Sequence, residues 1–172
     1  FRSKVVNSAL YGTNTEITSL QFAVTRLGMK AVSNIALSTS VFSAFKTTKK
    51  QIFDRRAFWK HSICTGIALN VIYDECKENL ENRYSKDILH LAGLLHGIGK
   101  IVLEQYFHED FSKAIKLAEE DEIPLHEAEL QVLKTDHAEI GAWLGIKWNL
   151  DPQLLQTIRW FHYPENADKE YQ

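Results

Sequence analysis

Apolar side chains recur every three or four residues along almost the whole chain, the spacing that is typical of amphipathic α-helices. An early example is the run Ile17, Leu20, Val24 and Leu27, which follows a stretch typical of a capping box, residues 13–16. Apolar and polar residues do not alternate over any useful length, so β-strands are not indicated. We therefore predict an all-α fold, a single compact multi-helix bundle.

Local start and stop signals divide this pattern into separate helices. Asp54 is suited to cap a helix, Pro124 stands at a helix start, and Asp151 is an N-cap followed by proline. Gly97 and Gly99 interrupt the most apolar segment of the chain and predict a bend or a close backbone approach. The predicted helical segments are residues 17–27, 29–45, 55–72, 87–107 with the glycine break inside it, 108–122, 124–136, 137–150 and 152–163.

The length and composition fit one globular domain. The chain has 172 residues, of which 45% are hydrophobic, enough to bury a substantial core. We expect residues 1–165 to form the domain and residues 166–172 to form a polar tail. Because the chain opens inside an amphipathic pattern without a cap, we also expect further helices of the domain to precede residue 1. The tryptophans are expected to fill the core and helix junctions, and an exposed one would mark a partner surface: Trp59, Trp143, Trp148 and Trp160.

Charge and cysteine content narrow the possible partners and the compartment. Lys and Arg total 20 against 22 Asp and Glu, a formal net charge of −2, which does not favour nucleic-acid binding. No apolar run approaches the roughly 20 residues of a membrane span, and residues 1–12 do not read as a signal peptide. Cys64 and Cys76 match neither a disulfide framework nor a common zinc signature, so we expect buried, reduced thiols. These features predict a cytoplasmic protein without membrane or nucleic-acid contacts.

Histidines are the residues with the clearest chemical potential. His108 and His126 lie in charged segments and are expected to be structural or exposed, while His90 does not share a helical face with His96. Four others lie in or beside elements rich in core residues: His61, His96, His137 and His162. Imidazoles delivered by separate helices into a bundle interior are one way in which helical proteins build metal sites.

Several ordered motifs carry a family resemblance. The segments "FWKHS", "LAGLLHGIGK", "DHAEIGAWLGIKW" and "IRWFHYP", preceded by "VVNSALYG" and "ITSLQFAVTRLG", resemble an HDOD domain over nearly the whole chain. That family is a degenerate, non-catalytic branch of the HD-domain and HD-GYP superfamily of metal-dependent phosphohydrolases. The resemblance implies a helical bundle of the HD-domain type. It also implies that the helices which normally precede the Asn-Ser-Ala segment are absent from this sequence.

The resemblance also implies positions for a site, and two of them have lost their ligands. Catalytic relatives place an aspartate directly after the second motif histidine, where this chain has Gly97 after His96. They also carry a later His-His pair, which is Phe161 and His162 here. Histidines alone suit zinc or nickel better than magnesium or manganese. Three carboxylates near the motifs are candidates to compensate, although nothing in the sequence aims them at the site: Asp136, Glu139 and Glu165.

Lys100 matches the lysine that helps active relatives to bind substrate phosphate. The vestigial HD-motif positions are thus His61, His96, Gly97, Lys100, His137 and His162. We expect no catalytic residue, no cofactor and no functional metal. A single divalent metal held by His61, His96, His137 or His162 is the exception left open.

These losses favour a non-catalytic regulatory module of bacterial signal transduction, acting through protein–protein or ligand-dependent coupling. The resemblance implies a protein partner or a fused signalling domain such as a receiver, GGDEF, EAL or kinase module. Two alternatives remain open. One is a metal-dependent phosphodiesterase or phosphohydrolase with an atypical site, and the other is a nucleotide-binding module without turnover.

Overall fold

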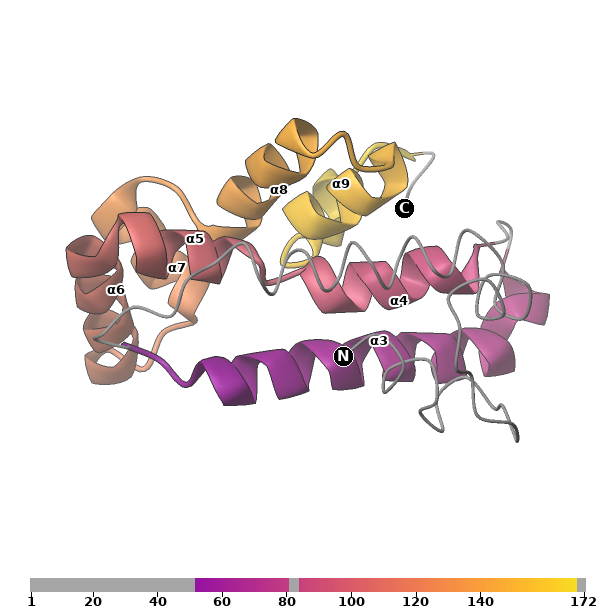
Figure 1. The fold of residues 1–172 in the computed structure, drawn as a ribbon, viewed down its shortest axis with the longest axis horizontal. Helices are drawn as coiled ribbons and strands as arrows, with labels where there is room; N and C mark the ends of the chain where they lie inside the picture. Colours follow the sequence, from indigo (N-terminus) through magenta and orange to yellow (C-terminus); the bar gives the residue numbers. More distant parts are fainter. Residues whose placement is uncertain (1–51, 81–83, 170–172) are drawn as a thin grey trace, which may run out of the picture. The chain divides into compact units, whose positions relative to one another are not determined.

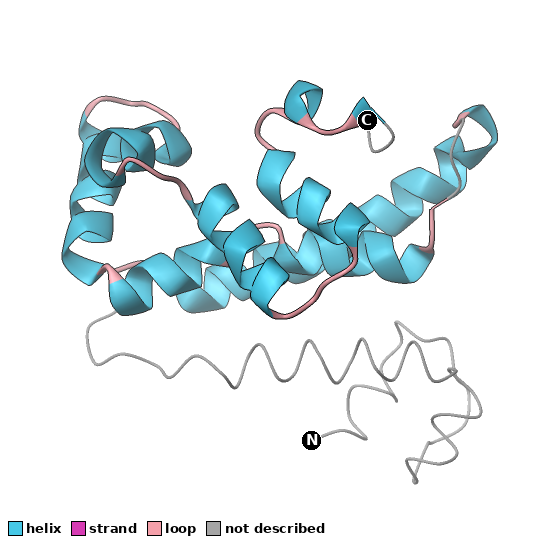
Figure 2. Ribbon diagram, turned by 90° about the horizontal axis from the view of Figure 1, so that it is seen from above, coloured by secondary structure: helices cyan, strands magenta, loops and turns pink. Residues whose placement is uncertain are grey.

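The computed structural model describes residues 52–80 and 84–169 of the chain, which belong to one unit, Phe45–Gln172. The helices predicted for residues 17–27 and 29–45 lie outside the described residues. Every regular element within the described ranges is helical, as predicted (Figure 2). The elements are α3 (Arg55–Cys76), η2 (Lys77–Asn79), α4 (Lys86–Leu95), α5 (Gly99–Tyr106), α6 (His108–Glu120), α7 (Leu125–Leu133), α8 (His137–Lys147), α9 (Pro152–Trp160) and η3 (Pro164–Asn166).

The predicted capping signals operate as expected. The Asp54 side chain accepts hydrogen bonds from the backbone N–H groups of Arg56 and Ala57, at 2.8 and 3.0 Å, and α3 begins directly after it. In the same way Asp151 accepts from the N–H of Gln153 at 2.9 Å at the start of α9. A cap satisfies backbone donors that have no partner inside the helix, so these local sequence signals fix where the helices begin.

Helices α3 and α4 run side by side and approach closely at two glycines (Figure 1). A Cβ atom at Gly93 would lie only 2.3 Å from the backbone nitrogen of Gly66, and a Cβ at Gly66 would lie 2.7 Å from the carbonyl oxygen of His90. No larger residue fits either position without moving one helix away from the other. The close approach carries His61, on α3, toward the C-terminal end of α4.

The predicted break at Gly97 and Gly99 is confirmed. Helix α4 ends at Leu95 and α5 begins at Gly99, with a turn between them. A Cβ atom at Gly99 would lie 1.9 Å from the carbonyl oxygen of His137, so only glycine lets the first turn of α8 rest on the backbone of α5. This contact sets His137 next to the turn that carries His96.

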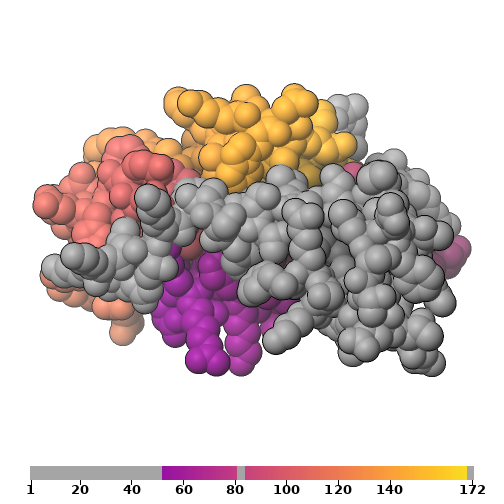
Figure 3. All heavy atoms as spheres, in the orientation of Figure 1, coloured from indigo at the N-terminus to yellow at the C-terminus, as the bar shows by residue number. Residues whose placement is uncertain are grey.

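Several helices contribute side chains to one buried core. Fully buried apolar side chains come from several helices: Leu95, Ile98, Ile101, Leu103, Phe111 and Ile158. A buried ion pair between Arg55 and Glu104 joins the start of α3 to α5. The side chains of α8 and α9 form a continuous area on the face seen in Figure 3.

Two expectations about burial were wrong. Cys64 and Cys76 are free thiols, as expected, but both are exposed. The buried residues of α3 include Ser62 and Gly66, one helical turn apart, and Cys64 lies between them in sequence and points to the other side. Trp143 is 63% exposed, whereas Trp59, Trp148 and Trp160 are half-buried.

Candidate functional site

Four separate elements bring the predicted histidines together. His61 lies on α3, His96 in the turn after α4, His137 at the start of α8 and His162 just after α9. The ring centroids of His61 and His96 are 5.4 Å apart, and those of His137 and His162 are 5.0 Å apart. We call these four residues the histidine cluster.

Phe161 links the two halves of the histidine cluster. Its ring centroid lies 5.1 Å from that of His96 and 5.8 Å from that of His137. Thus an apolar ring contacts both imidazoles from the position where the resemblance places one of a His-His pair. His96 is held on its other side because its Nδ1 hydrogen-bonds the carbonyl oxygen of Gly93 at 2.7 Å.

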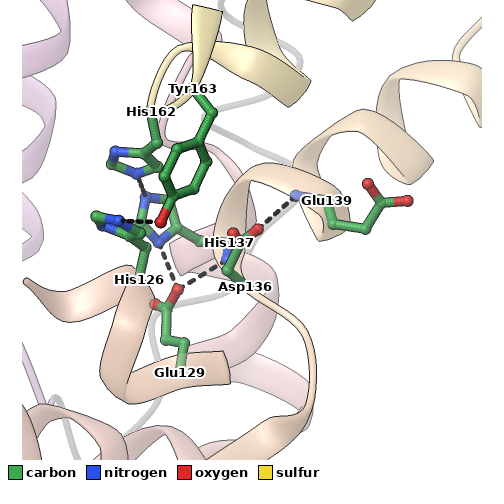
Figure 4. Close-up of polar contacts among 7 residues, drawn as sticks. All are labelled: His126, Glu129, Asp136, His137, Glu139, His162 and Tyr163. Carbon is green, nitrogen blue, oxygen red and sulfur yellow. Dashed lines mark hydrogen bonds and ion pairs between the residues drawn. The ribbon is translucent and has the colours of Figure 1, made fainter. Parts of the chain in front are cut away.

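Both ring nitrogens of His137 are engaged by protein groups. One carboxylate oxygen of the fully buried Glu129, on α7, lies 2.6 Å from Nδ1 and accepts the backbone N–H of His137 at 2.8 Å. On the other side of the ring, Nε2 lies 3.0 Å from Nε2 of His162. Figure 4 shows the resulting chain of contacts from Glu129 through His137 to His162. These contacts fix the orientation of the buried imidazole.

His126 and Tyr163 extend this chain toward the surface. The ring of His126 stacks on His162 with centroids 4.0 Å apart and an interplanar angle of 17°. Its Nε2 lies 3.0 Å from the hydroxyl of Tyr163 (Figure 4). Sequence reasoning expected His126 to be structural or exposed, and it did not single out Glu129 or Tyr163. The i, i+3 spacing of His126 and Glu129, which places both on one face of α7, was the available signal.

Burial determines the protonation of the buried pair. It raises the pKa of Glu129 to about 8, against the opposing effect of the His137 backbone amide, and it lowers the pKa of His137 well below its usual value. Both shifts have the same cause and favour the uncharged forms, a protonated carboxyl and a neutral imidazole, over a buried ion pair. Burial and the neighbouring histidines also lower the pKa of His162 to about 4.

The remaining motif positions lie nearby. Lys100 is in the first turn of α5 and is half-buried, so desolvation lowers the pKa of its amine while Glu129 raises it. Gly97 is buried, and a Cβ atom there would lie 3.0 Å from Cε2 of Phe58. Lys100 and His61 both line an open cavity of about 580 Å³ between the start of α3 and helix α6.

The carboxylates that could compensate for Gly97 have other partners. Asp136 accepts the backbone N–H of Glu139 at 2.8 Å and caps α8. Glu139 accepts from Nε1 of Trp143 at 2.6 Å and from Arg159 at 3.0 Å, and it points away from the histidine cluster (Figure 4). Glu165 is exposed in η3.

The donor set can be tested against the metal centre that the superfamily resemblance implies. Within residues 52–80 and 84–169, no group of three His, Cys, Asp or Glu side chains is placed to hold a metal ion. Metal pairs that activate water and stabilise a phosphoryl transition state need several such donors around each ion. Here one donor position is a glycine and another is a phenyl ring, so the described side chains do not fit a two-metal centre.

Comparison with known proteins identifies the class and then the family. The all-helical fold with a histidine-lined junction is of the HD-domain type, and the HDOD domain profile matches residues 4–164. The chain belongs to the HDOD domain family. An uncharacterized protein of Treponema pallidum (strain Nichols) is 30% identical over 169 residues, covering 98% of this chain and 31% of that protein. The chain therefore spans about a third of the length of this relative.

Solved structures share the fold. An HDOD domain protein of unknown function from Geobacter sulfurreducens superposes with a TM-score of 0.77 at 26% identity, over 98% of this chain and 54% of that one. A structure described as a proposed signal transduction protein from Marinobacter aquaeolei VT8 gives a TM-score of 0.79 at 23% identity, over 98% and 37% of the two chains. A structure described as a proposed phosphohydrolase from Shewanella amazonensis SB2B superposes with a TM-score of 0.74 at 23% identity, over 96% of this chain and 59% of that one. The last two likenesses show the fold alone.

None of the helices that the structure describes is both long enough and apolar enough to cross a membrane.

Proposed function

We propose that this chain is a non-catalytic module of signal transduction, in which a degenerate HD site serves as a structural junction between helices. It would act through protein–protein contacts or ligand-dependent coupling. The observation that carries the proposal is the position of Phe161, whose ring contacts both His96 and His137. A signalling role is also in keeping with the description of the Marinobacter aquaeolei structure.

The chemistry of phosphoester hydrolysis explains why this position matters. Bound metals must activate a water molecule and neutralise the charge that develops on phosphorus, and bridging carboxylates hold a pair of them together. The hydrocarbon surface of Phe161 offers no electron pair to a metal, and Gly97 offers no carboxylate. Both nitrogens of His137 are also committed to Glu129 and His162. The junction is therefore better suited to hold helices together than to bind hydrolytic metals.

The alternative function is a phosphohydrolase with an atypical site, in line with the description of the Shewanella amazonensis structure. We expect the chain to show no hydrolysis of bis-p-nitrophenyl phosphate or cyclic di-GMP above the buffer rate with manganese or nickel. The measurement is a turnover assay of the wild type beside a His137→Ala variant. Turnover that His137→Ala abolishes in a variant that remains folded would contradict the proposal.

A further inference from the structure

An open cavity lies beside the histidine cluster and is lined mainly by apolar side chains. It has a volume of about 580 Å³, within the range of roughly 300–1,000 Å³ that is typical of small-molecule sites. Its walls come from the start of α3, the inner face of α6 and the connection into α7. Its aromatic part is formed by Phe53, Phe58 and Phe111, with Phe53 packing edge-on against the other two at centroid distances of 5.8 and 6.0 Å. These rings hold each other in place and present a preformed apolar surface.

One cationic side chain faces this apolar surface. Lys100 is the only lysine or arginine among the described residues that line the cavity. Within the described ranges its amine has no hydrogen-bond or ion-pair partner. Burial lowers the pKa of the amine, which shows that the charged form lacks the solvation it would have in water. An anionic group that entered the cavity would supply the missing partner.

The charges of the lining indicate how many negative charges that group can carry. Asp54 and Glu119 also line the cavity, but both are exposed to solvent and Asp54 caps α3, so the half-buried Lys100 amine is the one lysine or arginine charge that the described lining offers to an anion. A phosphate dianion or a nucleotide would therefore leave charge unpaired next to apolar walls, which is costly. A single carboxylate on an apolar body matches both the one amine and the aromatic surface.

We propose that this cavity binds a small amphipathic carboxylate, with its carboxylate on Lys100 and its apolar body against Phe53, Phe58 and Phe111. Such a ligand would be the input of ligand-dependent coupling, so its biological meaning rests on the proposed function. Its binding does not depend on the absence of turnover. The two claims can therefore fail separately, since one is tested by binding and the other by hydrolysis.

The test is a titration of the 172-residue chain with 2-naphthoate, in which binding is measured by isothermal calorimetry and by changes in amide chemical shifts. We expect saturable binding to one site, with shifts concentrated around Lys100 and Phe111. Lys100→Met should weaken binding at least tenfold, because a charge-assisted hydrogen bond is lost while the length of the side chain is kept. Lys116→Met, a matched change on the exposed side of α6, should leave the affinity unchanged.

Two further comparisons separate the role of the cavity from that of the charge. Ala57 lines the cavity but is exposed, so Ala57→Trp should block binding while the chain stays folded. Naphthalene-2-carboxamide and 2-naphthyl phosphate, which keep the ring and change the head group, should bind more weakly than 2-naphthoate. Absence of naphthoate binding, equal binding of the amide, or tighter binding of the phosphate would each overturn the proposal.

Discussion

Replacing Gly97 with Asp and Phe161 with His together should raise the nickel affinity of this chain. The double variant restores a carboxylate after His96 and a histidine before His162, the two donors missing from the motif. A side chain at 161 lies within contact distance of His96 and His137, so an imidazole there would join existing nitrogen donors. We expect the nickel dissociation constant to fall at least tenfold relative to the wild type, measured by calorimetry with competition by a chelator.

Appropriate controls keep this result interpretable. An aspartate at 97 would press on the half-buried ring of Phe58, which would have to shift by a few tenths of an ångström to accept it. Each single variant should bind metal more weakly than the double variant. Phe107→His, a matched change at a side chain that is 48% exposed and is not part of the cluster, should have no effect. A folded double variant that binds no more nickel than the wild type would show that these two losses do not define the site.

Removing Glu129 should destabilise the chain more than any change at an exposed glutamate. Glu129→Leu leaves both the backbone N–H and Nδ1 of His137 buried without a partner. Each unsatisfied buried group costs about 1–3 kcal/mol, so we expect the free energy of unfolding to fall by about 3 kcal/mol. Glu127→Leu, on the exposed side of the same helix, should change it by no more than about 0.5 kcal/mol. Urea denaturation at pH 7 measures both, and equal effects would contradict the role given to Glu129.

Glu129 should also make the free energy of unfolding fall as the pH rises. The pKa of Glu129 is raised to about 8 in the folded chain from 4.5, so its contribution to stability is full below pH 4.5 and is lost as the pH rises through 8. Glu129→Gln removes this titration but keeps a polar side chain of the same shape. Relative to that variant, the wild type should lose roughly 1.4 kcal/mol per pH unit between pH 5 and 7.5. Parallel stability curves for the two proteins would show that Glu129 is ionised in the fold.

His162 changes the pH dependence of stability in the opposite direction, and it does so in both the wild type and Glu129→Gln. Its pKa is lowered to about 4 in the folded chain, so its contribution is lost as the pH falls from 6.5 toward 4. The comparison with Glu129→Gln subtracts this effect, because the variant retains His162.

Features set by neighbouring residues in the chain were predictable. Asp54 and Asp151 cap helices through hydrogen bonds to backbone groups two or three residues away, so their role is visible in the sequence. The break at Gly97 and Gly99 was predicted for the same reason, since glycine acts on its own backbone. The convergence of His61, His96, His137 and His162 was not a local signal, and it came from the family resemblance.

Features that depend on how helices pack were not predictable. The contact of Glu129 with His137 depends on how α7 meets α8, which no local pattern encodes. Cys64 and Trp143 were assigned to the interior by residue type, yet both are exposed, because type alone does not show which helix face finds a neighbour. The pairing of Phe161 with both His96 and His137 likewise became visible only in three dimensions.

Our central proposal is that this HDOD domain has lost the metal chemistry of the HD superfamily. Its most direct test is the metal content, by mass spectrometry, of tag-free protein purified without chelator or added metal, with the Gly97→Asp/Phe161→His variant as a positive control. We predict far less than one transition-metal ion per wild-type chain and close to one per variant chain. Near-stoichiometric metal in the wild type, lost in a folded His137→Ala variant, would contradict it.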